Sequence, residues 1–93
     1  MTRLRWTPEA AVDFEHLVER IRAENPAAAH RTARRIYQAI EILKVFPMRG
    51  RLSLVSDTRE LVFPGLPYIV VYEIADEQVH ILRIRHGAQD YGD

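Results

Sequence analysis

The last third of the chain holds three short apolar segments, and their close spacing limits what the chain can fold into. The segments cover residues 61–63, 68–74 and 79–84, and turn-forming residues separate them. Pro64-Gly65 suits the two central positions of a type II turn, which needs a positive φ at the second of them. Strands joined by such short connections run antiparallel, because a parallel crossover needs roughly a dozen residues or more. The sequence therefore predicts a three-stranded meander.

The middle segment is the strongest strand signal. Tyr68-Ile69-Val70-Val71-Tyr72 is apolar at every position, so both faces of a strand would carry apolar side chains. We expect this segment at the centre of the sheet, with helices over one face and partial cover on the other. The next segment carries Arg83 and Arg85 on one alternation and ends at His86.

Two Pro residues mark the starts of two helices. Thr7 can cap the first helix with its hydroxyl, and Pro8 suits the first helical position because it lacks an N–H that would stay unpaired. Asn25-Pro26 repeats this arrangement for the second helix, which we expect to continue until Phe46-Pro47. So short a link requires an antiparallel helix hairpin. Apolar residues at three- and four-residue steps form the packing faces: Ala10, Phe14, Leu17, Val18 and Ile21, then Ala29, Ala33, Ile36, Tyr37, Ile40 and Leu43.

These elements define an α+β fold. Residues 3–6 alternate polar and apolar side chains just before Pro8, so they predict a short opening strand. The expected architecture is a short N-terminal strand and an antiparallel helix hairpin packed on a mainly antiparallel sheet of three to four strands. Because the 93 residues show no shift in composition, we expect residues 1–93 to form a single domain.

Composition excludes several classes of function. The chain has no Cys, and its four His residues show no ligand spacing, so we expect no metal site. The four Gly residues form no phosphate-binding loop, so we expect no cofactor. Lys and Arg number 13 and Asp and Glu number 13, which argues against a nucleic-acid-binding field over the whole surface. Without a long apolar run or leader pattern, we expect no membrane contact and a cytoplasmic location.

Polar and cationic residues near the ends of the predicted strands form the candidate site. Residues 47–51 combine turn formers with two arginines and should form an exposed loop beside the sheet. We expect the cations of the last strand to converge with Arg59. The set that can hold a phosphate or an acidic protein surface is Arg49, Arg51, Arg59, Arg83, Arg85, His86, Gln89 and Tyr91.

A second basic group lies on the second predicted helix. It consists of His30, Arg31, Arg34 and Arg35. Because Glu24 and Glu41 lie nearby and charges on a helix exterior are usually hydrated, we interpret this group as a solvated helix face.

Several segments together resemble one family over essentially the whole chain. They are Trp6-Thr7-Pro8-Glu9-Ala10, Phe46-Pro47-Met48-Arg49-Gly50-Arg51, Arg59-Glu60-Leu61, Tyr68-Ile69-Val70-Val71-Tyr72 and Ile81-Leu82-Arg83-Ile84-Arg85-His86-Gly87-Ala88-Gln89-Asp90-Tyr91. In this order they resemble the RelE/ParE superfamily of type II toxins. The resemblance implies a toxin held inactive by a cognate antitoxin whose C-terminal segment wraps around it. It also implies no sequence-specific DNA binding without the antitoxin.

Within the superfamily the sequence is more similar to the ParE side. In RelE-like ribonucleases, which cut mRNA on the ribosome, the first meander strand carries lysines and the central strand carries an arginine. This chain has Glu60, Val62 and Ile69 at those places, and an isoleucine cannot neutralise a phosphate. Similarity to ParE-like toxins implies inhibition of DNA gyrase without nuclease activity. The implied contact residues are Arg49, Arg51, Arg59, Arg83, Arg85, His86 and Gln89.

Two alternatives stay open beside the gyrase hypothesis. A ribonuclease would surround the scissile phosphate with cations and an acid and base, drawn from Arg49, Arg59, Arg83, His86 and Tyr91. A non-toxic relative would keep only antitoxin binding or operon regulation. An antitoxin helix needs a groove for its apolar face, and we expect Phe14, Leu17 and Tyr37 to contribute to that groove.

Overall fold

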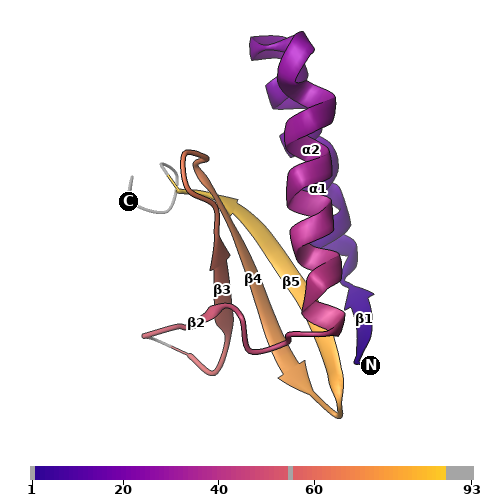
Figure 1. Ribbon diagram of the computed structural model, residues 1–93, viewed down its shortest axis with the longest axis vertical. Coiled ribbons are helices and arrows are strands. Elements are labelled where there is room, and N and C mark those ends of the chain that lie inside the picture. The colour runs from indigo at the N-terminus through magenta and orange to yellow at the C-terminus, as the bar shows by residue number, and fades with distance from the viewer. Residues whose placement is uncertain (1, 55, 88–93) are drawn as a thin grey trace.

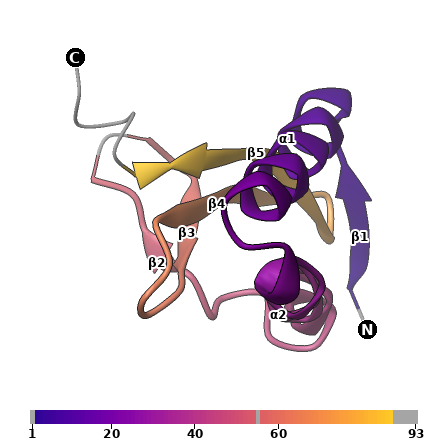
Figure 2. The same ribbon diagram turned by 90° about the horizontal axis from the view of Figure 1, so that it is seen from above.

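The computed structural model describes residues 2–54 and 56–87. Its elements, in chain order, are β1 (Arg3–Trp6), α1 (Pro8–Glu24), α2 (Pro26–Glu41), the 3₁₀ helix η1 (Ile42–Lys44), β2 (Arg51–Leu52), β3 (Arg59–Val62), β4 (Tyr68–Ala75) and β5 (Gln78–His86). The two helices lie together on one side of a single sheet (Figure 1), and the view from above shows α1 beside β5 and β1 (Figure 2). The predicted α+β fold, with its helix hairpin and meander, is confirmed.

The sheet has five strands in the order β1-β5-β4-β3-β2. Neighbours from β2 to β5 run antiparallel, whereas β1 runs parallel to β5. The sequence indicates three to four strands, and the structure corrects this number to five. The additional strand is β2, where Arg51 pairs with Glu60 at the end of the predicted loop. A two-residue strand is too short to show an alternation, so the sequence pattern does not reveal it.

Both helices begin where the sequence predicts. The Thr7 hydroxyl accepts a hydrogen bond from the Ala10 N–H at 3.1 Å, and the Asn25 side-chain oxygen accepts one from the Ala28 N–H at 3.3 Å. Asn25 also ends α1, because its own N–H donates to a carbonyl in the last turn of that helix. One residue therefore ends the first helix and caps the second, which fixes the antiparallel hairpin. The second α-helix ends earlier than predicted, at Glu41, and η1 follows it.

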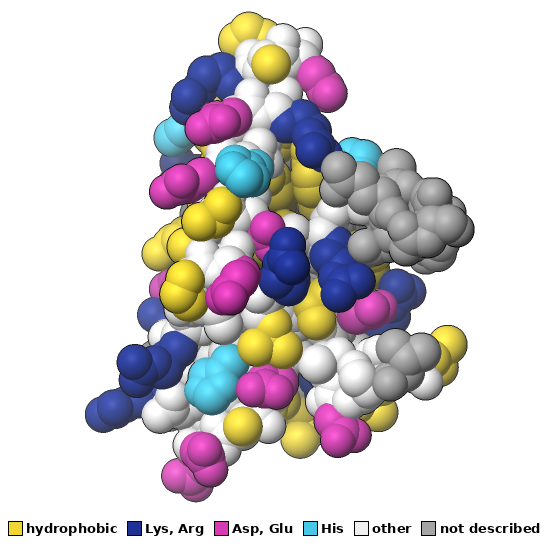
Figure 3. Space-filling model, turned by 180° about the vertical axis from the view of Figure 1, so that it is seen from behind, with side chains coloured by type: hydrophobic (Ala, Val, Ile, Leu, Met, Phe, Trp, Pro, Cys, Tyr) yellow, Lys and Arg dark blue, Asp and Glu magenta, His cyan; other side chains and the backbone are white. Residues whose placement is uncertain are grey.

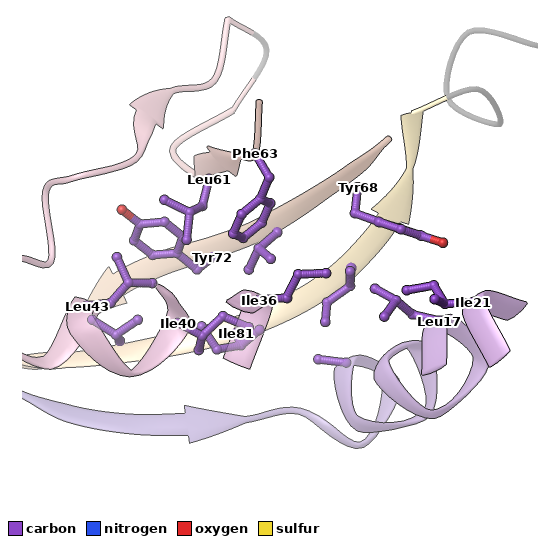
Figure 4. Packing of buried hydrophobic residues seen from close by; sticks show 14 of the residues in the cluster. Leu17, Ile21, Ile36, Ile40, Leu43, Leu61, Phe63, Tyr68, Tyr72 and Ile81 are labelled. Atoms are coloured by element: carbon purple, nitrogen blue, oxygen red, sulfur yellow. The ribbon is translucent and has the colours of Figure 1, made fainter. Parts of the chain in front are cut away.

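The core lies between the helix hairpin and the sheet (Figure 4). Its buried side chains include Leu17, Ile21, Ile36, Ile40, Leu43, Tyr68, Val70, Tyr72, Val79, Ile81 and Ile84. Burial alternates along β4, so one face of this strand packs on the helices and the other keeps partial cover, as expected. Burial of each large apolar side chain contributes roughly 1.5–3 kcal/mol to folding. No helix within the described ranges is long and apolar enough to cross a membrane.

Two tight turns join the long strands. The Leu66 N–H donates to the Phe63 carbonyl at 3.0 Å and Gly65 has a φ of 81°, which agrees with the predicted type II turn. Between β4 and β5, Asp76 and Glu77 have φ values of 54° and 60°. A two-residue hairpin of type I′ requires two successive residues with positive φ. Glu77 therefore occupies a position that glycine would adopt with less strain.

Tyr72 of β4 holds the loop at residues 47–50, which follows the helices, against the sheet. Its hydroxyl donates to the Pro47 carbonyl at 2.7 Å and accepts from the Gly50 N–H at 2.8 Å. Burial raises the pKa of Tyr72, and the Gly50 hydrogen bond opposes this only in part. Arg59 donates to the Gly50 carbonyl at 2.8 Å and to the Met48 carbonyl at 3.3 Å. A Cβ at Gly50 would lie 2.6 Å from the Tyr72 hydroxyl oxygen, so the loop needs glycine there.

Candidate functional site

The strand register separates the arginines that the sequence groups together. Arg59 lies opposite Tyr72, whose side chain is buried on the helix side of the sheet. Arg85 lies opposite Ile69, one of the alternate residues of β4, which face the other way. Paired residues share a face of a sheet, so Arg59 belongs to one face and Arg85 to the other, whereas Arg83, next to a register shift, reaches Asp13 of α1. The expected convergence of these cations with Arg59 is therefore wrong.

We call the face of the sheet turned away from the helices the open face. Its residues are Arg51 on β2, Glu60 and Val62 on β3, Ile69 and Val71 on β4, and Arg85 on β5. Val62 is 45% exposed and pairs with Ile69, so apolar side chains cross the middle of this face. Arginines stand at its borders, and Arg51 forms an ion pair with Glu60 at 3.0 Å. The open face thus has an apolar centre and a charged border.

Asp13 of α1 holds Arg83 in an ion pair with two hydrogen bonds. The Arg83 Nε donates to Asp13 Oδ2 at 2.7 Å, and Nη2 donates to Oδ1 at 3.1 Å. The Ile84 N–H donates to the same Oδ2 at 2.9 Å, beyond the end of β1. Burial raises the pKa of Asp13, but the bonds from Arg83 and Ile84 outweigh it, so the pKa is lowered overall. The same pair raises the pKa of Arg83. The charge of Arg83 is therefore balanced within the molecule.

Charges are also mixed on the face of the molecule that is seen from behind. The view from behind shows Lys and Arg side chains interspersed with Asp and Glu side chains (Figure 3). This pattern agrees with the equal numbers of acidic and basic residues in the sequence. This face therefore lacks the broad positive potential that attracts nucleic acid without contact specificity.

A pocket of about 250 Å³, which we call the His86 pocket, lies between α1 and the end of β5. Its lining residues are Asp13, His16, Leu17, Arg20, Tyr68, Arg83, Ile84 and His86. The rings of His86 and Tyr68 meet edge to face, with their centroids 5.4 Å apart. The His86 Nδ1 is buried and has no hydrogen-bond partner within residues 2–54 and 56–87. Burial raises the pKa of Tyr68, and the charge of Arg20 opposes this only in part.

The His86 pocket gathers groups that can hold an anion and transfer a proton. His16 and Arg20 are four residues apart on α1, so their side chains share one face of the helix. Imidazole and phenol groups beside an arginine are suited to acid–base chemistry at a phosphate. The sequence points to His86 but misses His16, Arg20 and Tyr68. The four-residue spacing of His16 and Arg20 is the only local signal that indicates a shared site.

Gln89 and Tyr91, which the sequence adds to the candidate site, lie outside the described residues. Within the part of the chain that is described, no group of three or more His, Cys, Asp or Glu side chains could hold a metal ion. Within the described residues, the candidate site consists of the open face and the His86 pocket.

The second basic group borders a larger groove of about 590 Å³ between α2 and β3. Its lining includes His30, Arg31, Arg34, Arg35, Ala39, Ile42, Arg49, Leu61 and Phe63. The cations of the helix are exposed, as expected for a solvated face. The sequence does not indicate that Arg49 joins them, because that contact depends on how the loop returns beside α2.

The structure corrects one of the three residues expected to contact an antitoxin. Leu17 is only 4% exposed and belongs to the core, so it offers no surface to a partner. Phe14 and Tyr37 form an aromatic cluster with Trp6, with ring centroids 5.7 to 6.2 Å apart. Tyr37 is 47% exposed. Antitoxin contact therefore stays a prediction for Phe14 and Tyr37.

A helix hairpin on a mixed five-stranded sheet is the fold of the toxins of type II toxin-antitoxin systems. The chain belongs to the ParE toxin family. Residues 4–91 match the family described as the ParE toxin of the type II toxin-antitoxin system parDE.

Curated relatives agree with this assignment. The chain is 38% identical over 89 residues to toxin RelE2 of Caulobacter vibrioides, and the aligned region covers 96% of this chain and 99% of the relative. It is 36% identical over 89 residues to the putative toxin Y4kP of Sinorhizobium fredii, covering 96% of this chain and 92% of that relative. Both matches span nearly the full length of each protein.

Solved structures of related proteins are toxin-antitoxin complexes. A chain of the chromosomal ParDE system from P. aeruginosa has a TM-score of 0.81 and 25% identity, covering 92% of this chain and 96% of that one. A chain of the RelBE2 complex from Mycobacterium tuberculosis has a TM-score of 0.58 and 28% identity, covering 91% and 96%. Relatives with ParE names and relatives with RelE names both occur. The similarity therefore establishes the toxin family, and the choice between gyrase and the ribosome as target depends on the site itself.

Proposed function

We propose that this chain is a cytoplasmic toxin that inhibits DNA gyrase through its open face and is neutralised by a cognate antitoxin. The observation that carries the proposal is the make-up of that face. Val62, Ile69 and Val71 form an apolar centre, and Arg51 and Arg85 stand at its border. Protein interfaces combine a charge-poor core with a polar rim, and they contain more arginine than the rest of the surface. A phosphate-binding face would place cations at the centre.

The state of the predicted cations also favours a protein target. Arg59 directs its guanidinium to the carbonyls of the 47–50 loop, and Arg83 is neutralised by Asp13. Cleavage of RNA requires cations that are free to stabilise charge developing on the phosphate. Of the expected contact residues, Arg51 and Arg85 lie on the open face, whereas Arg83 is held at α1 and Arg49 lies at the α2 groove.

The antitoxin part of the proposal rests on the family. Structures similar to this chain come from ParDE and RelBE toxin-antitoxin complexes. A small chain that buries a limited core benefits from a partner that binds only its folded state.

The test compares inhibition of supercoiling by purified gyrase for two matched variants. Val62→Asp places a carboxylate on the open face, and Val12→Asp makes the same change on α1 at nearly the same exposure, 45% against 46%. We expect Val62→Asp to weaken inhibition at least roughly tenfold, since it buries a charge at the interface centre, and Val12→Asp to keep it. Equal activity of the two variants, or no inhibition by the unaltered toxin, would refute the proposal.

A ribonuclease is the second candidate, and the His86 pocket is the observation that favours it. His86 lies beside Tyr68 in a pocket that also contains His16 and Arg20. Ribosomes programmed with a defined mRNA would show cleavage that His86→Ala abolishes and that His30→Ala, an exposed control on α2, retains. If growth stays normal on expression, the chain is instead a non-toxic, antitoxin-binding relative.

A further inference from the structure

The α2 groove is a basic surface whose lining includes no acidic residue. It brings His30, Arg31, Arg34 and Arg35 from α2 together with Arg49 from the loop. Arg35 donates to the Pro64 carbonyl at 3.1 Å, across the groove. Within the described part of the chain, Arg31, Arg34 and Arg49 form no salt bridge. Their charges are therefore available to a partner.

An apolar platform continues from the same groove. Ile42 at the start of η1 lines the groove, and Val45, Phe46 and Met48 follow in the loop after η1, where a second hollow again includes Arg49. Phe46 is 60% exposed and Met48 is 71% exposed. Exposed aromatic and thioether side chains in one cluster are typical of protein-binding surfaces rather than of solvated loops.

The platform is already held in position before any partner binds. The hydroxyl of Tyr72 and the guanidinium of Arg59 bind the backbone of the loop at Pro47, Met48 and Gly50. A partner that docks on this loop therefore does not have to order it, which reduces the entropy lost on binding.

We propose that the α2 groove and the apolar platform together bind one segment of the antitoxin, acidic at one end and apolar at the other. This inference rests on the proposed antitoxin partner and adds the site and chemistry of the contact. The basic half begins at residue 30 on α2 and the apolar half ends near residue 48. From residue 30 to its end at residue 41, α2 spans about 17 Å, which an acidic helix of roughly 12 residues matches in length.

Charge and apolarity together decide between a peptide and a nucleic acid. A nucleic acid would complement the arginines but would leave Val45, Phe46 and Met48 exposed to water. An amphipathic peptide satisfies both halves, because its carboxylates pair with the arginines and its apolar side chains cover the platform. The equal numbers of acidic and basic residues in the chain also disfavour a general nucleic-acid binder.

The experiment first identifies the antitoxin by its ability to neutralise the toxin. Cells that express the toxin receive clones from the genome that encodes this chain, and clones that restore growth are selected. The protein encoded by the rescuing clone is the probe. Its affinity is measured by calorimetry for the unaltered toxin, for Arg31→Glu with Arg34→Glu, and for Arg3→Glu with Arg22→Glu. Both double variants change exposed arginines and alter the net charge equally.

We expect the α2 double variant to bind about 30-fold or more weakly, because attraction becomes repulsion, and the control pair to lose less than about threefold. High salt should weaken the unaltered complex but not that of the α2 variant, in which salt screens a repulsion instead of an attraction. Phe46→Ser should also weaken binding, with the salt dependence retained. Circular dichroism confirms that each variant is folded.

Three outcomes overturn the inference, and they differ in whether the proposed antitoxin partner is overturned as well. If no clone restores growth, the antitoxin part of the proposed function fails and the inference fails with it. If the antitoxin binds all variants equally, the inference alone fails. If the arginine reversals abolish binding of a short DNA duplex and leave antitoxin binding intact, the groove is a nucleic-acid site instead.

Discussion

Replacing Tyr72 by phenylalanine removes one oxygen atom and tests how the 47–50 loop is held. The change deletes two hydrogen bonds, one to the Pro47 carbonyl and one from the Gly50 N–H. Each bond contributes about 1 kcal/mol net, and an unpaired buried N–H adds a further penalty of about 1 kcal/mol or more. Because the ring keeps its packing, these contributions add up to an expected loss of about 3 kcal/mol. In a chain of this size that loss lowers Tm by roughly 10–20 °C.

Tyr37→Phe is the matched control for this measurement. It removes the same oxygen from a tyrosine that is 47% exposed and stacked on Trp6, so the expected change is within about 0.5 kcal/mol. Urea unfolding followed by circular dichroism should show a lower midpoint for Tyr72→Phe at an unchanged slope. The reasoning is refuted if the two variants unfold within about 0.5 kcal/mol of each other.

Three further predictions follow from the geometry. Gly50→Ala should destabilise the fold by about 2 kcal/mol or more in urea unfolding, since its Cβ would meet the Tyr72 hydroxyl at 2.6 Å; near-native stability would contradict this. Asp13→Asn should cost about 2 kcal/mol at pH 7 by losing charge-assisted bonds to Arg83 and the Ile84 N–H. Because the folded pKa of Asp13 is lowered, its contribution is present above the unfolded value of about 4 and disappears as the pH falls through the folded pKa, so the two proteins should converge in acid. Glu77→Gly should raise the free energy of unfolding by up to about 1 kcal/mol, and Tm with it, because the φ of 60° at this position suits glycine; a lower Tm would show that the turn is not strained.

Local signals predicted the helices well because the interactions behind them are local. Thr7 and Asn25 each bond to a backbone N–H three residues ahead, so a few letters of sequence contain the whole interaction. The type II turn at Gly65 was predictable for the same reason. These features depend on backbone chemistry that neighbouring residues determine.

The site was harder to predict because it depends on register and on distant contacts. A register shift between Val71 and Tyr72 changes which residues of β5 face the helices, and no residue pattern announces it. Arg83 meets Asp13 across 70 positions of sequence, so the cation counted as available for a target is already paired. An apolar stripe marks the packing side of a helix, but it does not show that Leu17 is fully covered. Tertiary packing decides each of these points.

The parallel pairing of β1 with β5 has a consequence for the chain during its synthesis. The Thr7 hydroxyl bonds the Leu82 carbonyl, 75 positions later, so the first strand to leave the ribosome has to wait for the last. At about 5–20 residues per second, this wait lasts several seconds, during which the helix hairpin lacks the sheet edge it packs on. Asp13 meets Arg83 only after β5 has emerged. A ribosome that stalls before β5 therefore releases a fragment without a complete open face or a complete His86 pocket.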